Sequence, residues 1–121
     1  MGEKERLRKN SQFAAVYERG RTWANELVVL KTLPNGLDWN RYGFVVGKRI
    51  GKAVARNLVK RRLREVVRAA TLKTGWDVVL IARSPSAAAD YHELGASVAG
   101  LLRRARILED RDRSEGTIEA E

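Results

Sequence analysis

The stretch from Ala53 to Ala70 constrains the fold more than any other part of this chain. It contains no Pro or Gly and many good helix formers, so it predicts a helix of about five turns. At about 100° per residue, one side of this helix is apolar. The apolar stripe consists of Val59, Leu63, Val66, Val67 and Ala70. Such a stripe needs a core, and we therefore expect a globular domain in which this helix covers other elements.

The side adjoining that stripe is cationic. It carries Arg56, Asn57, Lys60, Arg61, Arg64 and Arg68, and the single acid of the helix, Glu65, lies beyond its edge. Like charges four residues apart repel each other, so an ordinary exposed helix face would include acids. A polyanion would neutralise this surface, because guanidinium groups suit phosphate oxygens. The pattern favours RNA or DNA binding, and the alternative is a solvated basic face that serves solubility.

Charge is distributed unevenly along the chain. The net charge is +9, but residues 109–121 hold six acids and two arginines, so residues 1–108 carry +13. Ten of the positive charges fall between Arg41 and Arg68. Such a surface attracts polyanions through counterion release, and nucleic acid is the first partner to expect. We predict one RNA-binding domain over residues 1–108 and a disordered acidic tail over residues 109–121.

Three segments have the pattern of strands. The apolar, β-branched run from Ala24 to Leu33 and the run from Tyr42 to Val46 are separated by turn residues at 35–40. We expect these two runs to pair antiparallel. The continuous apolar run from Trp76 to Ala82 predicts a central strand that is buried on both faces.

Two further helices are predicted, one near each end of the chain. The first covers residues 11–20, with Asn10 or Ser11 as N-cap and Gly20 as a left-handed terminator. The last begins at the N-cap Asp90, with Glu93 completing a capping box, and runs to about residue 108.

Phe13 and Tyr17 lie on one side of the first predicted helix. They can simply pack on the sheet, or they can form a stacking platform for unpaired bases. Basic neighbours favour the platform slightly. These neighbours are Arg8, Lys9, Arg19 and Arg21.

The chain offers little for catalysis. It has no cysteine, which excludes disulfides, a thiol nucleophile and Cys-based metal sites, and suits a reducing cytosol. Its one histidine, His92, cannot form a two-histidine acid/base pair or a His-rich metal site. No apolar stretch follows the charged N-terminal residues, so we expect a cytoplasmic protein with no membrane contact. We predict no catalytic residue and leave any metal site unknown.

A basic pattern, roughly R-N-x-x-K-R-x-x-R-E, runs through Arg56, Asn57, Lys60, Arg61, Arg64 and Glu65. In this pattern, and over residues 45–65 as a whole, the chain resembles the protein subunit of bacterial ribonuclease P. The resemblance extends to residues 6–13, to Gly20 and to residues 79–85, and covers roughly residues 5–105. The acidic tail lies outside it.

The resemblance implies an α/β fold, a two-layer sandwich of about four strands and three helices, similar to a domain of ribosomal proteins, with a left-handed βαβ crossover. It also implies a division of labour in which a catalytic RNA releases the 5′ leader of precursor tRNA and the protein assists. Magnesium would be held mainly by the RNA, with one protein for each catalytic RNA.

The same resemblance assigns two groups of binding residues. The catalytic RNA would contact Lys48, Arg49, Lys52, Arg56, Asn57, Lys60, Arg61, Arg64 and Arg68. A cleft between the first helix and the sheet would hold the single-stranded leader, lined by Phe13, Tyr17, Val29 and Lys31.

Two positions depart from the family pattern. Leu58 stands where an arginine is usual, off the cationic face, which predicts one fewer RNA contact. Lys31 replaces a tyrosine that is common on the cleft strand, so leader binding there should depend more on charge and less on stacking.

Three other functions stay open. A ribosomal or duplex-RNA-binding protein would use the same basic helix without cleavage. A small autonomous nuclease would have to use His92 as its base. A DNA-reading helix-turn-helix protein is disfavoured, because strands and not a partner helix are predicted on both sides of the basic helix.

Overall fold

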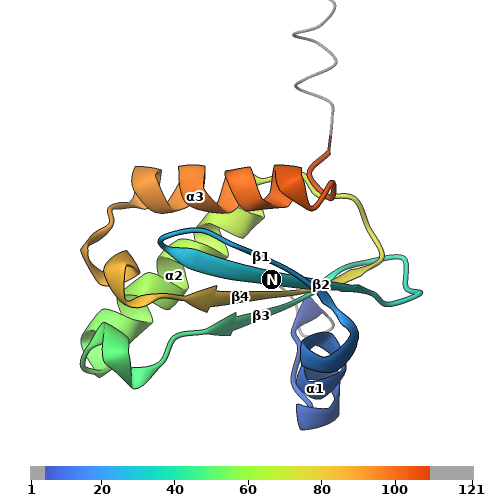
Figure 1. Cartoon of the computed structure of the whole chain (residues 1–121), viewed down its shortest axis with the longest axis horizontal. Coiled ribbons are helices and arrows are strands. Elements are labelled where there is room, and N and C mark those ends of the chain that lie inside the picture. Colours follow the sequence, from blue (N-terminus) through green and yellow to red (C-terminus); the bar gives the residue numbers. More distant parts are fainter. Residues whose placement is uncertain (1–4, 110–121) are drawn as a thin grey trace, which may run out of the picture.

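The computed structural model describes residues 5–109, which form an α/β fold with three α-helices and a four-stranded mixed sheet (Figure 1). In chain order the elements are α1 (Asn10–Arg19), β1 (Arg21–Ala24), β2 (Val28–Pro34), β3 (Arg41–Val45), α2 (Ala53–Ala69), β4 (Trp76–Ala82) and α3 (Tyr91–Arg104). Two short 3-10 turns, η2 (Lys48–Ile50) and η3 (Ser84–Ala88), follow β3 and β4. The predicted fold class is confirmed, and the predicted acidic tail lies outside the described residues apart from Glu109.

The strand order is β1-β2-β4-β3, so the apolar strand β4 is central as predicted. It pairs antiparallel with β2 and parallel with β3, and α2 connects the two parallel strands. The predicted pairing of β2 with β3 is wrong, because β4 lies between them. The physical reason is that β4 is apolar on both faces from Val78 to Ala82 and is best buried between two neighbours.

Strand β1 was not predicted as a separate element. It forms a hairpin with β2, with Trp23 opposite Leu30. Asn25 closes the turn, since its side-chain oxygen accepts hydrogen bonds from the backbone N–H groups of Leu27 and Val28, both at 3.0 Å. The strand is short and mostly exposed, so it carries little of the apolar alternation that marks a strand in a sequence.

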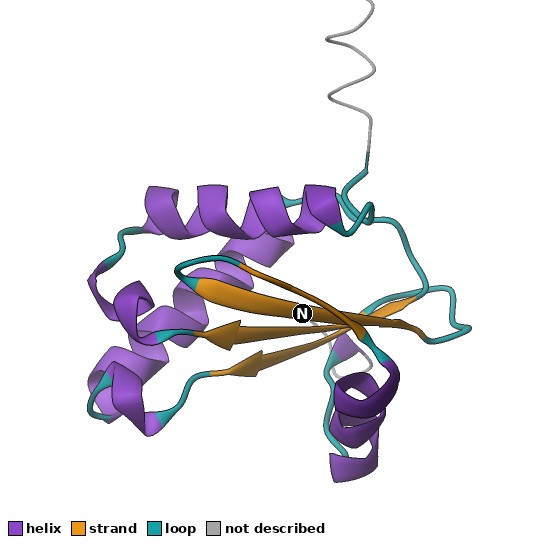
Figure 2. Cartoon of the chain, in the orientation of Figure 1, coloured by secondary structure: helices purple, strands orange, loops and turns teal. Residues whose placement is uncertain are grey.

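The two faces of the sheet are covered to different extents (Figure 2). Helices α2 and α3 cover one face, where the predicted stripe of α2 packs with Leu30, Leu80 and Leu94 in the larger core. Helix α1 crosses the other face, where Leu7, Val16 and Val79 form a small buried cluster. This second face is only partly covered, and the candidate site lies there and along the edge next to α2.

The ends of α3 test two sequence predictions. The capping box is confirmed: the Glu93 N–H donates to Asp90 at 2.8 Å, and the Asp90 N–H donates to Glu93 at 2.9 Å. The helix ends at Arg104, earlier than predicted, because the chain turns at Arg106 with a positive φ of 63°. That turn buries Ile107, which a continued helix would not do at this position.

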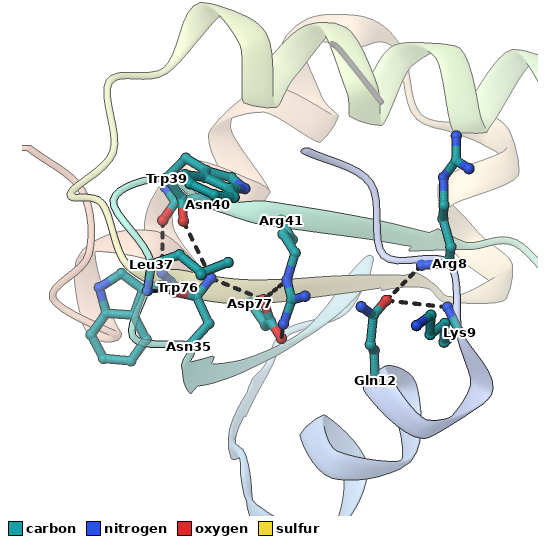
Figure 3. A network of polar contacts seen from close by, with 10 residues as sticks. All are labelled: Arg8, Lys9, Gln12, Asn35, Leu37, Trp39, Asn40, Arg41, Trp76 and Asp77. Atoms are coloured by element: carbon teal, nitrogen blue, oxygen red, sulfur yellow. Dashed lines mark hydrogen bonds and ion pairs between the residues drawn. The ribbon is translucent and has the colours of Figure 1, made fainter. Parts of the chain in front are cut away.

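The predicted ends of α1 are wrong in detail. The N-cap is Lys9, and the Gln12 side-chain oxygen accepts hydrogen bonds from the Arg8 and Lys9 N–H groups at 2.9 and 3.1 Å (Figure 3). Gly20 has an extended backbone, not a left-handed one. Glycine is required there for space, because a Cβ atom would lie 2.4 Å from the Val16 carbonyl oxygen and 2.7 Å from that of Thr32.

Candidate RNA-binding surfaces

The cationic face of α2 (Arg56, Asn57, Lys60, Arg61, Arg64 and Arg68) forms two rows on the folded protein. Arg56, Lys60 and Arg64 are half-buried, whereas Asn57, Arg61 and Arg68 are exposed. The helix is fixed from its other side, where Val59, Leu63, Val66 and Val67 are buried. The six side chains that the sequence placed on one face therefore do lie together on a rigid element.

Local contacts hold part of the half-buried row in place. The Arg64 guanidinium carbon lies 5.9 Å from the centre of the Phe44 ring on β3. The Nε atom of Arg56 is buried and has no hydrogen-bond partner among residues 5–109. A buried charged donor without a partner is costly, and an anionic oxygen would satisfy it.

Arg62 belongs to a different surface. It lies off the cationic face and donates a hydrogen bond of 2.8 Å to the Ala89 carbonyl oxygen. It therefore ties α2 to the segment that precedes α3, and we assign it a structural role.

A pocket of about 460 Å³ lies at the outer edge of β3, where α2 meets the N-terminal segment. We call it the edge pocket; it is lined by Arg6, Leu7, Arg8, Phe13, Tyr42, Gly43, Phe44, Lys60 and Arg64. The N-terminal segment is held there because the Leu7 N–H donates to the Tyr42 carbonyl oxygen at 3.0 Å. The pocket joins the two groups of residues that the sequence assigned to separate surfaces, since Lys60 and Arg64 share it with Phe13.

Phe13 and Tyr17 both lie between α1 and the sheet but differ in exposure. The Phe13 ring is half-buried over Gly43, where a Cβ atom would lie 2.6 Å from the ring. Tyr17 is 45% exposed, and the Lys31 amino group lies 5.6 Å from the centre of its ring. Phe13 thus packs on the sheet and also lines the edge pocket, whereas the Tyr17 ring is exposed beside Lys31.

Beside α1, the sheet presents a row of half-buried apolar side chains. Val29 of β2 is opposite Ile81 of β4, and Ile81 is opposite Val45 of β3. We call these three residues the open row. Lys31 lies on the next row, under α1, where its amino group donates to the Thr22 hydroxyl at 3.0 Å. Lys31 therefore lies next to Tyr17 of α1, and Val29 lies two residues before it on the same face of β2.

The open row leads into a second pocket, of about 550 Å³, at the ends of the parallel strands β3 and β4. This end pocket is lined by Val45, Gly47, Lys48, Arg49, Ile50, Ile81, Ala82, Arg83, Ser84 and Pro85. The structure thus places Lys48 and Arg49 beside the open row, whereas the sequence grouped them with α2. Lys52 is exposed at the N-cap of α2.

Several residues of these surfaces had no signal of their own in the sequence. The sequence pattern predicts Ile81, Val45 and Arg83 only as residues of a strand or of a strand end. Alternation with a period of two along β3 and β4 would have placed Val45 and Ile81 on one face, once the strand order was known. The strand order depends on long-range pairing, which the sequence pattern did not supply.

An ion pair fixes the same face of the sheet that α1 crosses, at the opposite end of β3 and β4 from the open row (Figure 3). Arg41 donates to both carboxylate oxygens of Asp77 at 2.8 Å, and the Asn35 amide donates to the same carboxylate at 3.0 Å. The hydrogen bond to Asp77 raises the pKa of Arg41, and burial raises the pKa of Tyr42 above its ordinary value. The Asn40 side chain donates a hydrogen bond to the Lys73 carbonyl oxygen and accepts one from the Trp76 N–H.

Residues 5–109 offer few groups for catalysis or metal binding. His92 is exposed on α3 and packs edge-on against Tyr91, with 5.9 Å between the ring centres. No group of three His, Asp or Glu side chains within residues 5–109 is placed to hold a metal ion. Over the same residues, no helix is both long and apolar enough to cross a membrane.

Comparison with known proteins identifies the family. The family model described as Ribonuclease P matches residues 1–106. The chain belongs to the ribonuclease P protein family. A ribonuclease P protein component from Caldanaerobacter subterraneus subsp. tengcongensis is 44% identical over 110 residues, which cover 89% of this chain and 95% of that protein. The family resemblance seen in the sequence is therefore confirmed.

Solved structures of the family have the same fold. The RNase P protein of Staphylococcus aureus is 31% identical, with a TM-score of 0.79 over 87% of this chain and 98% of that one. The RNase P protein from Thermotoga maritima is 33% identical, with a TM-score of 0.76 over 83% and 96%. As a family member, the chain is a subunit of ribonuclease P, the endoribonuclease of tRNA 5′ maturation.

Proposed function

We propose that the protein binds two RNAs through two surfaces that meet at the edge pocket. The cationic face of α2 takes the catalytic RNA, and the open row beside α1 takes the single-stranded 5′ leader of precursor tRNA. The observation that carries this proposal is the one-sided charge of α2, whose five cations share a face that includes no acid. The catalytic step belongs to the RNA.

Three observations support binding of the catalytic RNA by α2. The helix is held rigidly by its buried side, so its cations keep their spacing without a ligand. Half-buried cations lose less side-chain freedom on binding than exposed ones, and Arg56, Lys60 and Arg64 are of this kind. The buried Nε of Arg56, which has no partner among residues 5–109, would gain a hydrogen-bond acceptor from a phosphate once the side chain turns outward on binding.

The surface proposed for the leader differs in character. Val29 and Ile81 form an apolar floor, and the exposed ring of Tyr17 lies 5.6 Å from the amino group of Lys31, two residues after Val29 on β2. Lys48 and Arg49 line the adjoining end pocket, which favours a role in leader binding over the contact with catalytic RNA that the sequence suggested. Bases would lie on the apolar and aromatic groups while these cations meet the phosphates.

Magnesium enters the proposal through the RNA. The protein would reduce repulsion between the phosphates of the two RNAs, so less magnesium would be needed for cleavage. One protein would serve one catalytic RNA, and the cytoplasmic location expected from the sequence remains part of the proposal. No residue of this chain is given a role in hydrolysis.

Charge reversal on α2 tests the proposal directly. Arg64→Glu should weaken binding to a transcript of bacterial ribonuclease P RNA by at least about tenfold, because it removes one phosphate contact and adds a repulsive charge. Arg103→Glu is the matched control, since Arg103 is exposed on α3 and undergoes the same change of charge. Equal losses for the two variants, measured by filter binding at one salt concentration, would contradict the assignment.

Two alternatives have distinct outcomes. Capture of ribosomal RNA but no ribonuclease P RNA from labelled cell RNA would favour a general structured-RNA-binding protein. The protein preparation can be freed of bound RNA by RNase before precursor tRNA is added. Cleavage of the precursor that persists after this treatment would favour an autonomous nuclease. A helix-turn-helix is excluded, because β3 and β4 flank α2 in the chain.

A further inference from the structure

Residues 109–121 have a charge opposite to that of the rest of the chain. They hold six acids and two arginines, for a net charge of −4, against +13 for residues 1–108. The structure describes the first of them, Glu109, and the family match ends at residue 106. The segment therefore begins just beyond the residues that the family model matches, and its first residue lies in the part of the chain that the structure describes.

That starting point lies beside the end of α2. The segment after α3 pairs antiparallel with the segment after α2, with a bridge between Leu108 and Leu72. The Glu109 N–H donates to the Thr71 carbonyl oxygen at 2.7 Å, and the Lys73 N–H donates to that of Ile107 at 2.8 Å. Figure 1 shows the two segments side by side. The acidic segment thus leaves the domain next to the helix that carries the cationic face.

The cationic face is within reach of this exit. Arg68 is exposed in the last turn of α2, and Arg56 lies about 18 Å from it along the helix axis at 1.5 Å per residue. Residues 110–121 could span about 40 Å if extended and about 20 Å as an average coil. A segment tethered this closely has an effective concentration on the order of millimolar at the face.

Charge complementarity selects α2 among the surfaces near the exit. None of Arg56, Lys60, Arg61, Arg64 and Arg68 forms an ion pair with an acid among residues 5–109. The other cations nearby are Lys73, Arg103, Arg104 and Arg106, and Arg104 donates to the Ala24 carbonyl oxygen at 3.3 Å. The face on α2 therefore holds more positive charge than the end of α3.

We propose that residues 110–121 bind the cationic face of α2 in the RNA-free protein and act as an intramolecular competitor of RNA. A cognate RNA that contacts the whole face displaces the segment, whereas a short or non-cognate RNA competes with it poorly. The segment thereby improves discrimination between RNAs. The docking step stands on charge, reach and the exit point, and the competition step rests on the RNA binding proposed above.

A spin label tests the docking step without any RNA. The chain has no cysteine, so Thr117→Cys provides a single attachment site for a nitroxide. We expect broadening of amide signals of α2 around Arg61 and Arg64 at low salt, which should disappear at high salt. Broadening confined to α3, or unchanged by salt, would overturn the proposal.

Matched neutral variants test the competition step. Glu115→Gln, Glu119→Gln and Glu121→Gln together remove three charges from the segment. Glu18→Gln, Glu26→Gln and Asp38→Asn together remove three exposed acids from other parts of the protein. The first set should raise affinity for a polyuridine 20-mer about threefold to tenfold at low salt, and the second set clearly less. Equal gains would show an effect of net charge alone and would overturn competition.

The two proposals fail in different ways. If α2 does not bind RNA, Arg64→Glu leaves RNA affinity unchanged while the salt-sensitive broadening persists. If the segment does not dock, the broadening is absent and Arg64→Glu still weakens RNA binding. Binding of the full-length ribonuclease P RNA should rise less than that of polyuridine in the first set of variants, and an equal rise would contradict a role in discrimination.

Discussion

Leu80 and Ile81 are neighbours on β4, yet they lie on opposite faces of the sheet. Leu80 is fully buried in the core under α2 and α3, whereas Ile81 is half-buried in the open row and lines the end pocket. The same contrast separates the two faces of the whole sheet. One face is filled by two long helices, and the other carries a single short one. The difference indicates that stability comes mainly from the first face, and the second, only partly covered, is the one that we propose takes a ligand.

The largest expected effect is a difference in stability between variants of Leu80 and of Ile81. Leu80→Ala should lower the free energy of unfolding by about 2–5 kcal/mol, because it leaves a cavity in the larger core. Ile81→Ala should cost less than about half of that, since its side chain already meets solvent. Urea unfolding of the two variants measures the ratio, and equal losses would mean that both faces support the fold equally.

A smaller effect is expected where α1 meets the sheet. Gly43→Ala should lower the free energy of unfolding by about 1–3 kcal/mol, because the added methyl group would lie 2.6 Å from the Phe13 ring. Adding Phe13→Leu to that variant should recover part of the loss by removing the contact. A double-mutant cycle measures this coupling, and simple additivity would show that Phe13 does not set the requirement for glycine.

The smallest effect concerns binding and not folding. Tyr17→Ala should reduce the preference for precursor over mature tRNA by about 1 kcal/mol, because one stacked base is lost. Stability should change little, since Tyr17 is 45% exposed. Tyr91→Ala is the control, as Tyr91 is 38% exposed on α3, away from the open row in sequence and in the fold. Loss of discrimination in both variants would argue against a leader surface beside α1.

The elements that depend on local sequence were predicted well. The apolar and cationic stripes of α2 follow from a single helical period, and the central position of β4 follows from its apolar run from Val78 to Ala82. The capping box of Asp90 and Glu93 is likewise a local signal. Each of these depends on residues a few positions apart.

What depends on distant segments was predicted poorly. The pairing of β2 with β4 joins residues about fifty positions apart, and no local pattern encodes it. The glycine at position 20 was read as a left-handed terminator, whereas its role is to let two backbone segments approach. The edge pocket combines the N-terminal segment, α1, β3 and α2, so its composition follows only from the assembled fold.

The central claim is that the cationic face of α2 binds the catalytic RNA and that the open row beside α1 binds the leader. Its most direct test is reconstitution with bacterial ribonuclease P RNA and precursor tRNA, at a magnesium concentration where the RNA alone is nearly inactive. Cleavage at the mature 5′ end should require the protein. Excess protein should restore the activity of Arg64→Glu but not the substrate preference of Tyr17→Ala. No stimulation by the wild-type protein while it remains bound to the RNA, or rescue of both variants by excess protein, would contradict the account.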